Sequence, residues 1–202
     1  MAAEQNKKKV KVGMISLGCA KNQVDGEMLM ASLEENGFEL SDDVGICDIA
    51  IVNTCGFIES AKKESIEEIL ELCKLKEEGR IKKIVVAGCL AQRYQEEIRK
   101  EIPEADAVLG IGANGQIAEH LKKLWEEGTP VECFPPKTEM PLCGSRTLTT
   151  PSYYAYLKIA EGCSNGCSYC AIPMIRGGYR SRPMESIIAE ATCTGNCACR
   201  SC

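Results

Sequence analysis

The sequence predicts an α/β fold built on an open parallel sheet, because short apolar runs alternate with amphipathic stretches from Val10 onward. These runs are rich in Val, Ile and Ala and are unbroken, which is typical of strands buried on both faces. With 202 residues, the chain can hold one domain and part of another. We therefore expect a Rossmann- or flavodoxin-like sheet as the amino-terminal domain.

Four strands are expected, over residues 10–17, 46–52, 84–87 and 105–109. Apolar side chains at helical spacing predict the helices between them. Those side chains are Val24, Met28, Leu29 and Leu33, then Ile66, Ile69, Leu70 and Cys73, then Leu90, Tyr94 and Ile98. Pro103 ends the third helix, and a fourth begins at Asn114 and ends at Gly128.

The pattern changes after Gly128. Residues 129–152 hold five of the eight prolines and show no periodicity, so we expect a linker. Residues 153–160 are strand-like, and a cysteine-rich loop, a basic loop and a helix over about 184–191 follow. The expected organisation is a flexible tail at 1–9, a domain at 10–128, the linker at 129–152, the start of a second domain at 153–191, and a cysteine-rich, unstructured tail at 192–202.

The composition contains 14 cysteines but one histidine, His120, and a net charge of -5. No apolar signal segment follows the first lysines, so a reducing, cytoplasmic setting is favoured over a disulfide scaffold. One histidine nearly excludes Cys2His2 zinc sites and Cys/His nucleophile pairs. No run reaches the roughly 18 apolar residues of a membrane span, and the acidic balance offers no strong nucleic-acid signal.

Three cysteines follow the expected strands at equivalent positions. Cys19, Cys55 and Cys89 are separated by 36 and 34 residues, which is one β-α-β repeat each. The loops after parallel strands gather along one edge of a sheet, so the three thiols should converge on one ligand site. Three thiolates suit zinc with a fourth ligand or a 4Fe-4S cluster with one open iron, and spacing alone leaves both open. The alternative is that all three are core cysteines, as we expect of Cys47 and Cys73.

A second set lies in the segment EGCSNGCSYC, where Cys163, Cys167 and Cys170 stand at positions i, i+4 and i+7. This loop follows an expected strand. A zinc knuckle is the alternative reading, but paired Cys-x-x-Cys arms are absent. The motif resembles the signature of the radical S-adenosylmethionine superfamily. That resemblance implies a cubane held at three corners, an open iron that chelates S-adenosyl-L-methionine, and Tyr169 packed near the nucleoside.

Both sets together make the chain similar to the methylthiotransferase family. The matching segments are SLGCAKNQVDGE at 16–27, VNTCGFI at 52–58, AGCLAQRY at 87–94 and KIAEGCSNGCSYCAIPMIRGGYRSRP at 158–183. The resemblance implies that Cys19, Cys55 and Cys89 hold an auxiliary 4Fe-4S cluster involved in sulfur delivery. It implies that Cys163, Cys167 and Cys170 hold the radical-generating 4Fe-4S cluster, in the first strand and helix of a β/α barrel.

The segment LGCAKNQVD, which ends at Asp25, resembles the corresponding sequence in one branch of the family. That branch methylthiolates the β-carbon of an aspartate in the twelfth small-subunit ribosomal protein. Branches that act on tRNA adenosine derivatives usually have different residues after Gly-Cys, and they remain the alternative. The resemblance implies an adenosyl radical that abstracts hydrogen, and a second S-adenosylmethionine as methyl donor. The implied partners are the ribosomal protein, a sulfur donor, and an electron donor such as flavodoxin or ferredoxin.

The chain departs from the family in its length. Only 50 residues follow Ser152, far fewer than a barrel needs, so we expect a carboxyl-terminally truncated form whose own activity is doubtful. The tail cysteines, Cys193, Cys197, Cys199 and Cys202, match nothing in the family and leave a metal site or an altered reading frame open. A non-catalytic iron–sulfur-binding fragment is therefore the alternative of another class. Arg176, Arg180 and Arg182 are expected either to meet a cofactor or acidic substrate or to be solvated.

Overall fold

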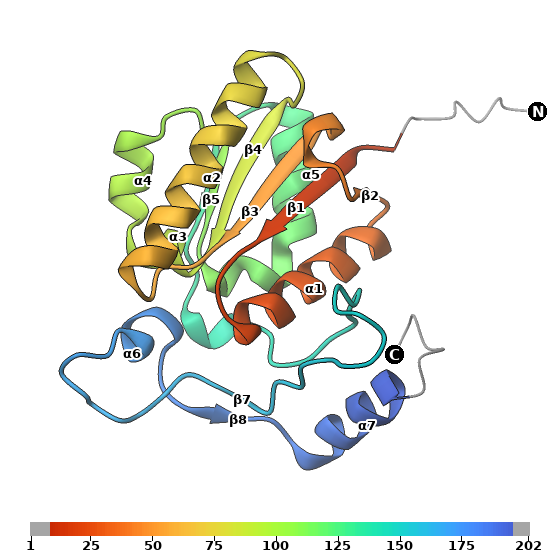
Figure 1. Ribbon diagram of the computed structural model, residues 1–202, viewed down its shortest axis with the longest axis vertical. Helices are drawn as coiled ribbons and strands as arrows, with labels where there is room; N and C mark the ends of the chain where they lie inside the picture. Colours follow the sequence, from red (N-terminus) through yellow and green to blue (C-terminus); the bar gives the residue numbers. More distant parts are fainter. Residues whose placement is uncertain (1–8, 196–202) are drawn as a thin grey trace, which may run out of the picture.

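The structure of the chain, a computed structural model, describes residues 9–195 and contains a six-stranded parallel sheet in the order β2-β1-β3-β4-β5-β6 (Figure 1). The strands are β1 (Lys11–Ser16), β2 (Glu39–Ser41), β3 (Ile49–Thr54), β4 (Lys83–Gly88), β5 (Ala107–Leu109) and β6 (Val131–Cys133). The open parallel sheet predicted from the sequence is confirmed. The order reverses between β1 and β3, which is the flavodoxin-like arrangement.

Helices cover both faces of the sheet. Helices α1 (Ala20–Glu35) and α5 (Ile117–Glu127) pack on one face, whereas α2 (Glu59–Glu77), α3 (Cys89–Arg93) and α4 (Gln95–Glu101) pack on the other (Figure 1). The third expected helix is two short helices that meet at Tyr94. Short 3-10 turns, η1 (Val44–Ile46), η2 (Ile111–Gln116) and η3 (Lys137–Glu139), complete this part of the chain.

The core has two apolar layers separated by the sheet. Every residue of β3 is buried, as expected of a central strand with helices on both sides. Leu29 and Leu33 of α1 contribute to one layer, and Ile69 and Leu72 of α2 contribute to the other. Cys47 and Cys73 are buried in the second layer at 3% and 7% exposure, which confirms them as core thiols.

Strands β2 and β6 were not predicted. Each is three residues long and lies at an edge of the sheet. Glu39 and Glu132 interrupt their apolar pattern, and short charged edge strands are a common way of protecting a sheet from further pairing. Strand β6 lies within residues 129–152, so part of the expected linker belongs to the sheet.

The remaining chain forms a small layer of its own, made of β7 (Ala160–Glu161), α6 (Ile172–Arg176), β8 (Arg180–Ser181) and α7 (Met184–Gly195). The expected strand at 153–160 is wrong in extent, because only β7 forms, and it pairs antiparallel with β8. No parallel neighbour pairs with residues 153–159 within the described chain. Most of their apolar side chains are accordingly exposed, for example Tyr153 at 82% and Ile159 at 58%, whereas Lys158 is buried.

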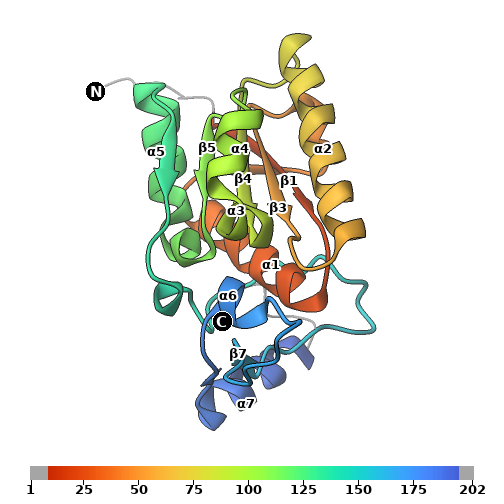
Figure 2. The same ribbon diagram turned by 90° about the vertical axis from the view of Figure 1, so that its left-hand side faces the viewer.

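Helix α7 continues further than expected. It runs through Cys193 to Gly195, so the first residues of the predicted unstructured tail are helical. Cys197, Cys199 and Cys202 lie outside the described residues. Figures 1 and 2 both show α6, β7 and α7 beneath the end of the sheet where the strands finish, with α6 close to α3. This layer therefore faces the carboxyl ends of the strands, which is where the sequence predicts a ligand site.

Candidate functional site

The first set of cysteines occupies the carboxyl ends of three neighbouring strands. Cys19 is the residue that precedes α1 after β1, Cys55 follows β3, and Cys89 is the first residue of α3 after β4. Because β1, β3 and β4 are parallel neighbours, all three cysteines lie at the same end of the sheet, and Cys19 and Cys55 flank the point where the strand order reverses. This is the placement that the repeat spacing predicts.

Glycines let the three cysteine loops pack against each other. A Cβ atom added to Gly18 would lie 2.7 Å from the Cys55 sulfur, and one added to Gly56 would lie 2.9 Å from the Cys89 carbonyl oxygen. Such distances are available only to residues without a side chain. The Cys19 loop therefore abuts the Cys55 loop, which in turn abuts the Cys89 loop. Within residues 9–195, no group of three or more Cys, His, Asp or Glu side chains is already arranged around a metal position.

Two buried asparagines hold the first pair of loops. The Asn22 amide group donates to the carbonyl oxygens of Leu17 (2.7 Å) and Asn53 (3.0 Å). The Asn53 amide group donates in return to the Asn22 carbonyl oxygen (2.8 Å) and to Ser16 Oγ (3.0 Å). Since Cys19 and Cys55 lie within three residues of these amides, the network fixes their backbones relative to one another.

Two hydroxyl groups hold the other loops. Thr54 Oγ1 donates to the Ala87 carbonyl oxygen (2.6 Å) and accepts from the Leu90 N–H (3.2 Å), which ties β3 to the Cys89 turn. Ser65 Oγ on α2 accepts from the Cys55 N–H (3.0 Å) and donates to its carbonyl oxygen (3.2 Å). Sequence reasoning missed these residues. A polar side chain ending an otherwise apolar strand, such as Thr54, is the signal that could have found them.

The three thiols differ in access. Cys55 and Cys89 are each 6% exposed, whereas Cys19 is exposed and borders a cavity of about 740 Å³ that Gln23 and Thr149 also line. Burial raises the pKa of the Cys89 thiol to about 11, although the nearby Arg176 guanidinium lowers it in part. The open side of the site is therefore the Cys19 side.

The second set of cysteines lies in the loop between β7 and α6. The Cys163 N–H donates to the Gly177 carbonyl oxygen (3.1 Å), and the Cys170 N–H donates to that of Cys167 (3.1 Å). Cys163 and Cys170 are half-buried and Cys167 is exposed. Tyr169 is 89% exposed, so within the described residues its ring does not pack against the protein.

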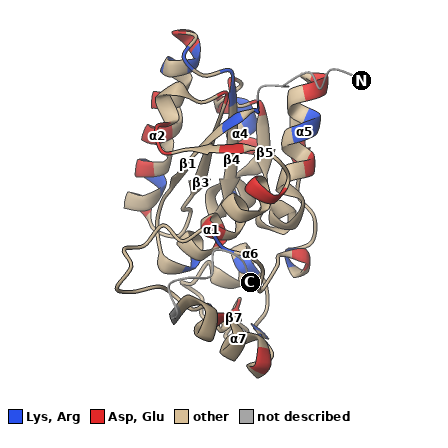
Figure 3. Ribbon diagram, turned by 90° about the vertical axis from the view of Figure 1, so that its right-hand side faces the viewer, with Lys and Arg blue, Asp and Glu red and all other residues tan. Residues whose placement is uncertain are grey.

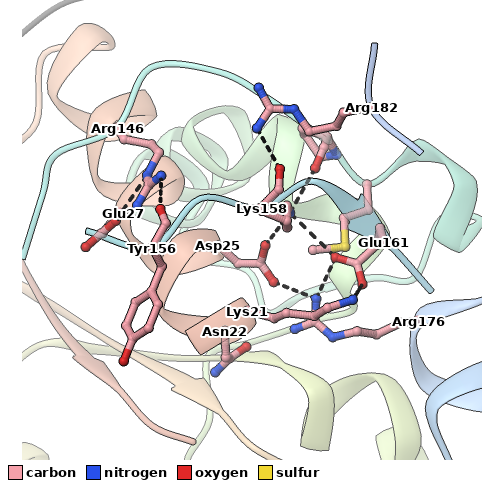
Figure 4. Close-up of polar contacts among 12 residues, drawn as sticks. Lys21, Asn22, Asp25, Glu27, Arg146, Tyr156, Lys158, Glu161, Arg176 and Arg182 are labelled. Carbon is pink, nitrogen blue, oxygen red and sulfur yellow. Dashed lines mark hydrogen bonds and ion pairs between the residues drawn. The ribbon is translucent and has the colours of Figure 1, made fainter. Parts of the chain in front are cut away.

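A buried ion network joins the segments on either side of this loop to α1 (Figure 4). Asp25 of α1 pairs with Lys158 Nζ (2.7 Å) and with Arg176 Nη1 (2.9 Å). Glu161 pairs with the same two cations at 3.5 and 2.8 Å. All four side chains are at most 2% exposed, and their two negative and two positive charges balance. Burial alone would raise the pKa of Glu161, but Arg176, the Gly162 N–H and Lys158 together lower it.

A second buried network lies beside the first. Arg146 pairs with Glu27 and Glu190 at 2.5 Å each, and Arg182 pairs with Glu190 at 2.5 Å. Arg182 also donates to the Lys158 carbonyl oxygen (2.8 Å). The expectation of a solvated or ligand-facing arginine loop is thus wrong for Arg176 and Arg182, which pair with carboxylates inside the protein. Arg180 donates to backbone carbonyl oxygens of residues 137–140.

The residues that follow β1, β3 and β4 directly and could bind a metal are the thiols of Cys19, Cys55 and Cys89. The only histidine, His120, lies on α5, which follows β5 and not one of these three strands. Thiolates are the ligands that iron–sulfur clusters and thiolate zinc sites require, so the residues present fit a cluster. Fold and site together define an open-sheet α/β domain with a thiol-lined switch point.

The chain is similar to several named bacterial proteins. The model of a family described as "Uncharacterized protein family UPF0004" matches residues 11–110. The chain is 52% identical over 180 residues to the protein from Thermoanaerobacter sp. (strain X514) named ribosomal protein uS12 methylthiotransferase RimO, covering 89% of this chain and 41% of that protein. Proteins of the same name from Clostridioides difficile and Geobacter sulfurreducens are 50% and 47% identical over 90% and 91% of this chain, and 41% of each of those proteins is covered.

The chain belongs to this methylthiotransferase family, and it spans about two fifths of the length of these relatives. About nine tenths of this chain is aligned with each of them. Among the described helices, none is long and apolar enough to cross a membrane. Figure 3 shows acidic and basic residues on the same helices, for example on α2 and α5.

Proposed function

We propose that this chain is the cluster-holding part of a methylthiotransferase that adds a methylthio group to the aspartate β-carbon of ribosomal protein uS12. The observation that carries the proposal is the placement of Cys19, Cys55 and Cys89 side by side at the carboxyl ends of β1, β3 and β4. The names of relatives about 50% identical support the substrate. A tRNA adenosine derivative is the alternative substrate, and no observation on the described residues favours it.

The cofactors are two 4Fe-4S clusters and S-adenosyl-L-methionine. Cys19, Cys55 and Cys89 hold the auxiliary cluster, whereas Cys163, Cys167 and Cys170 hold the radical-generating one, with Tyr169 near the nucleoside. When bound, these groups supply reductive cleavage of a sulfonium and a source of sulfur. The all-thiol donor set supports the assignment, and the exposure of Tyr169 leaves its ring free to meet a ligand.

The protein's own residues orient these sites and exclude water from one side. Asn22 and Asn53 hold the Cys19 and Cys55 loops, and Thr54 holds the Cys89 turn. Cys55 and Cys89 face the protein interior, so substrate and sulfur donor approach from the exposed Cys19 side.

The domain division follows from these assignments. Residues 10–128, extended by β6, form the auxiliary-cluster domain, and 153–191 begin the radical domain. A flavodoxin or ferredoxin supplies electrons in the cytoplasm, where reduced thiols persist.

Anaerobic reconstitution with iron and sulfide tests the proposal. Two clusters correspond to about eight irons per chain, and the triple variants Cys19→Ala/Cys55→Ala/Cys89→Ala and Cys163→Ala/Cys167→Ala/Cys170→Ala should each retain about four. The variant Cys73→Ala is the matched control, because Cys73 is a buried thiol outside both sets and should retain all the iron.

Activity is measured separately. Production of 5′-deoxyadenosine, and a methylthio mass increment on the uS12 aspartate, are the expected results. About four irons, unchanged by Cys163→Ala and without cleavage of S-adenosylmethionine, would show a non-catalytic iron–sulfur fragment instead. Modification of tRNA but not of uS12 would overturn the substrate.

A further inference from the structure

Among residues 9–195, Arg176 is the largest of the fully buried side chains. It is the last residue of α6, six residues after Cys170, and it is 2% exposed. A guanidinium group stays charged in proteins, so it must be paired wherever water is excluded. The groups that pair with Arg176 therefore indicate its role in the structure.

The two ends of the guanidinium group have different partners. Nη1 pairs with Asp25 (2.9 Å) and Glu161 (2.8 Å), whereas Nη2 donates to the Cys89 sulfur at 3.4 Å. Lys158 pairs with the same two carboxylates, so the four buried charges already balance. The hydrogen bond to sulfur is consequently an addition to a complete ion network and not a means of neutralising Arg176.

Two adjacent residues, Arg176 and Gly177, contact one cysteine from each set. Gly177, the next residue, accepts a hydrogen bond from the Cys163 N–H (3.1 Å), while Arg176 itself reaches Cys89. Ala171 and Ile175 pack against Cys89 as well, and together they form a small apolar cluster. The loop of the second set is therefore seated directly on one cysteine of the first.

We propose that Arg176 is a positioning residue that couples the two cluster sites by donating a hydrogen bond to the Cys89 sulfur. The inference rests on the proposed function, because it concerns Cys89 as a cluster ligand. A hydrogen bond and a positive charge beside a ligating sulfur raise the reduction potential of an iron–sulfur cluster. Arg176 thus stabilises the reduced auxiliary cluster and fixes the second loop beside it.

The test isolates the auxiliary site. The triple variant Cys163→Ala/Cys167→Ala/Cys170→Ala serves as the parent, and Arg176→Gln, Arg176→Lys and Arg182→Gln are added to it. Arg182 is the matched control, since it is a buried arginine of the same segment that bonds Glu190 and the Lys158 carbonyl oxygen but no cysteine. Iron content, the electron paramagnetic resonance spectrum and the midpoint potential of the reconstituted cluster are measured.

We expect Arg176→Gln to shift the potential to more negative values or to lose iron, Arg176→Lys to fall between it and the parent, and Arg182→Gln to match the parent in potential. Equal potentials and iron contents in Arg176→Gln and Arg182→Gln would overturn the inference while leaving the proposed function intact. A parent that binds no iron at its amino-terminal site would overturn the proposed function, and the inference with it.

A second measurement avoids dependence on variants that fail to fold. The parent is produced with guanidino-15N arginine, and pulsed electron paramagnetic resonance of the reduced cluster should detect a weakly coupled 15N nucleus. The coupling should persist in Arg93→Lys, whose side chain bonds the Gly56 carbonyl oxygen near Cys55. If no 15N coupling were detected, or if it disappeared in Arg93→Lys, Arg176 would not be the residue that contacts the cluster, and the inference would be overturned.

Discussion

Gly88 illustrates how one missing side chain permits the site. Its φ is +92°, and a Cβ atom there would lie 2.6 Å from the Thr54 carbonyl oxygen and 2.7 Å from Asn53 Oδ1. We expect Gly88→Ala to lower the free energy of unfolding by about 2–5 kcal/mol through strain and overpacking. Urea unfolding followed by circular dichroism measures the change.

Gly37 provides the matched control for that prediction. Its φ is +90°, but a Cβ atom there would meet nothing within 4 Å. Gly37→Ala should therefore lower the free energy of unfolding by only about 1–2 kcal/mol, which is the cost of a left-handed backbone conformation for alanine. Equal losses in the two variants would contradict the claim that close packing of the cysteine loops excludes a side chain at residue 88.

The Cys89 thiol should alkylate slowly in the metal-free, reduced chain. Burial raises its pKa to about 11, so the thiolate fraction at pH 8 is roughly 0.001 and rises about tenfold for each pH unit up to the pKa. Iodoacetamide labelling resolved by peptide mass spectrometry should show Cys89 lagging behind the exposed Cys143 and gaining speed from pH 8 to pH 9. A Cys89 rate equal to that of Cys143 at pH 8 would refute this.

Helix α1 is fastened to the β7–α6 layer by Asp25. Asp25→Asn leaves Lys158 and Arg176 buried with one carboxylate fewer, so we expect a loss of about 3–5 kcal/mol in the free energy of unfolding. Hydrogen exchange should quicken at residues 158–176 more than in the sheet, because the network joins these two parts.

An exposed ion pair supplies the comparison. Glu39 of β2 pairs with Lys11 at 3.4 Å, with side chains 48% and 36% exposed. Glu39→Gln should change the free energy of unfolding by less than about 1 kcal/mol. If Asp25→Asn proved as mild, the buried network would not be what holds the two layers together.

Elements that the sequence missed are short or depend on distant partners. β2 and β6 have three residues each, and β6 exists because β5 accepts it in parallel register. The strand expected at 153–160 fails for the opposite reason, since its apolar residues have no parallel partner within the described chain. Local pattern reports the apolar content of a segment, whereas pairing decides whether that segment is a strand.

The whole molecule presents an apolar surface at residues 153–159. Tyr153, Tyr154 and Ile159 are 82%, 45% and 58% exposed, and apolar patches of this kind bind hydrophobic dyes or partners. We expect the chain to enhance the fluorescence of anilinonaphthalene sulfonate. Replacing the three residues by Ser should reduce the enhancement by about twofold or more.

Ile46 is a suitable control, because it is 61% exposed but lies on η1, away from these residues. Ile46→Ser should leave the dye fluorescence nearly unchanged. Equal fluorescence before and after the triple replacement would show that the patch is covered in solution.

The sequence alone determined the parallel sheet and the location of Cys19, Cys55 and Cys89 at its carboxyl edge. Both follow from local physics: apolar runs make buried strands, and parallel strands end at the same edge. Only the tertiary structure decided that Arg176 and Arg182 are buried, because their carboxylate partners are set by packing. Asp25 and Lys158 are 133 residues apart, and no local periodicity records a contact that forms only when the second cysteine loop docks on the first.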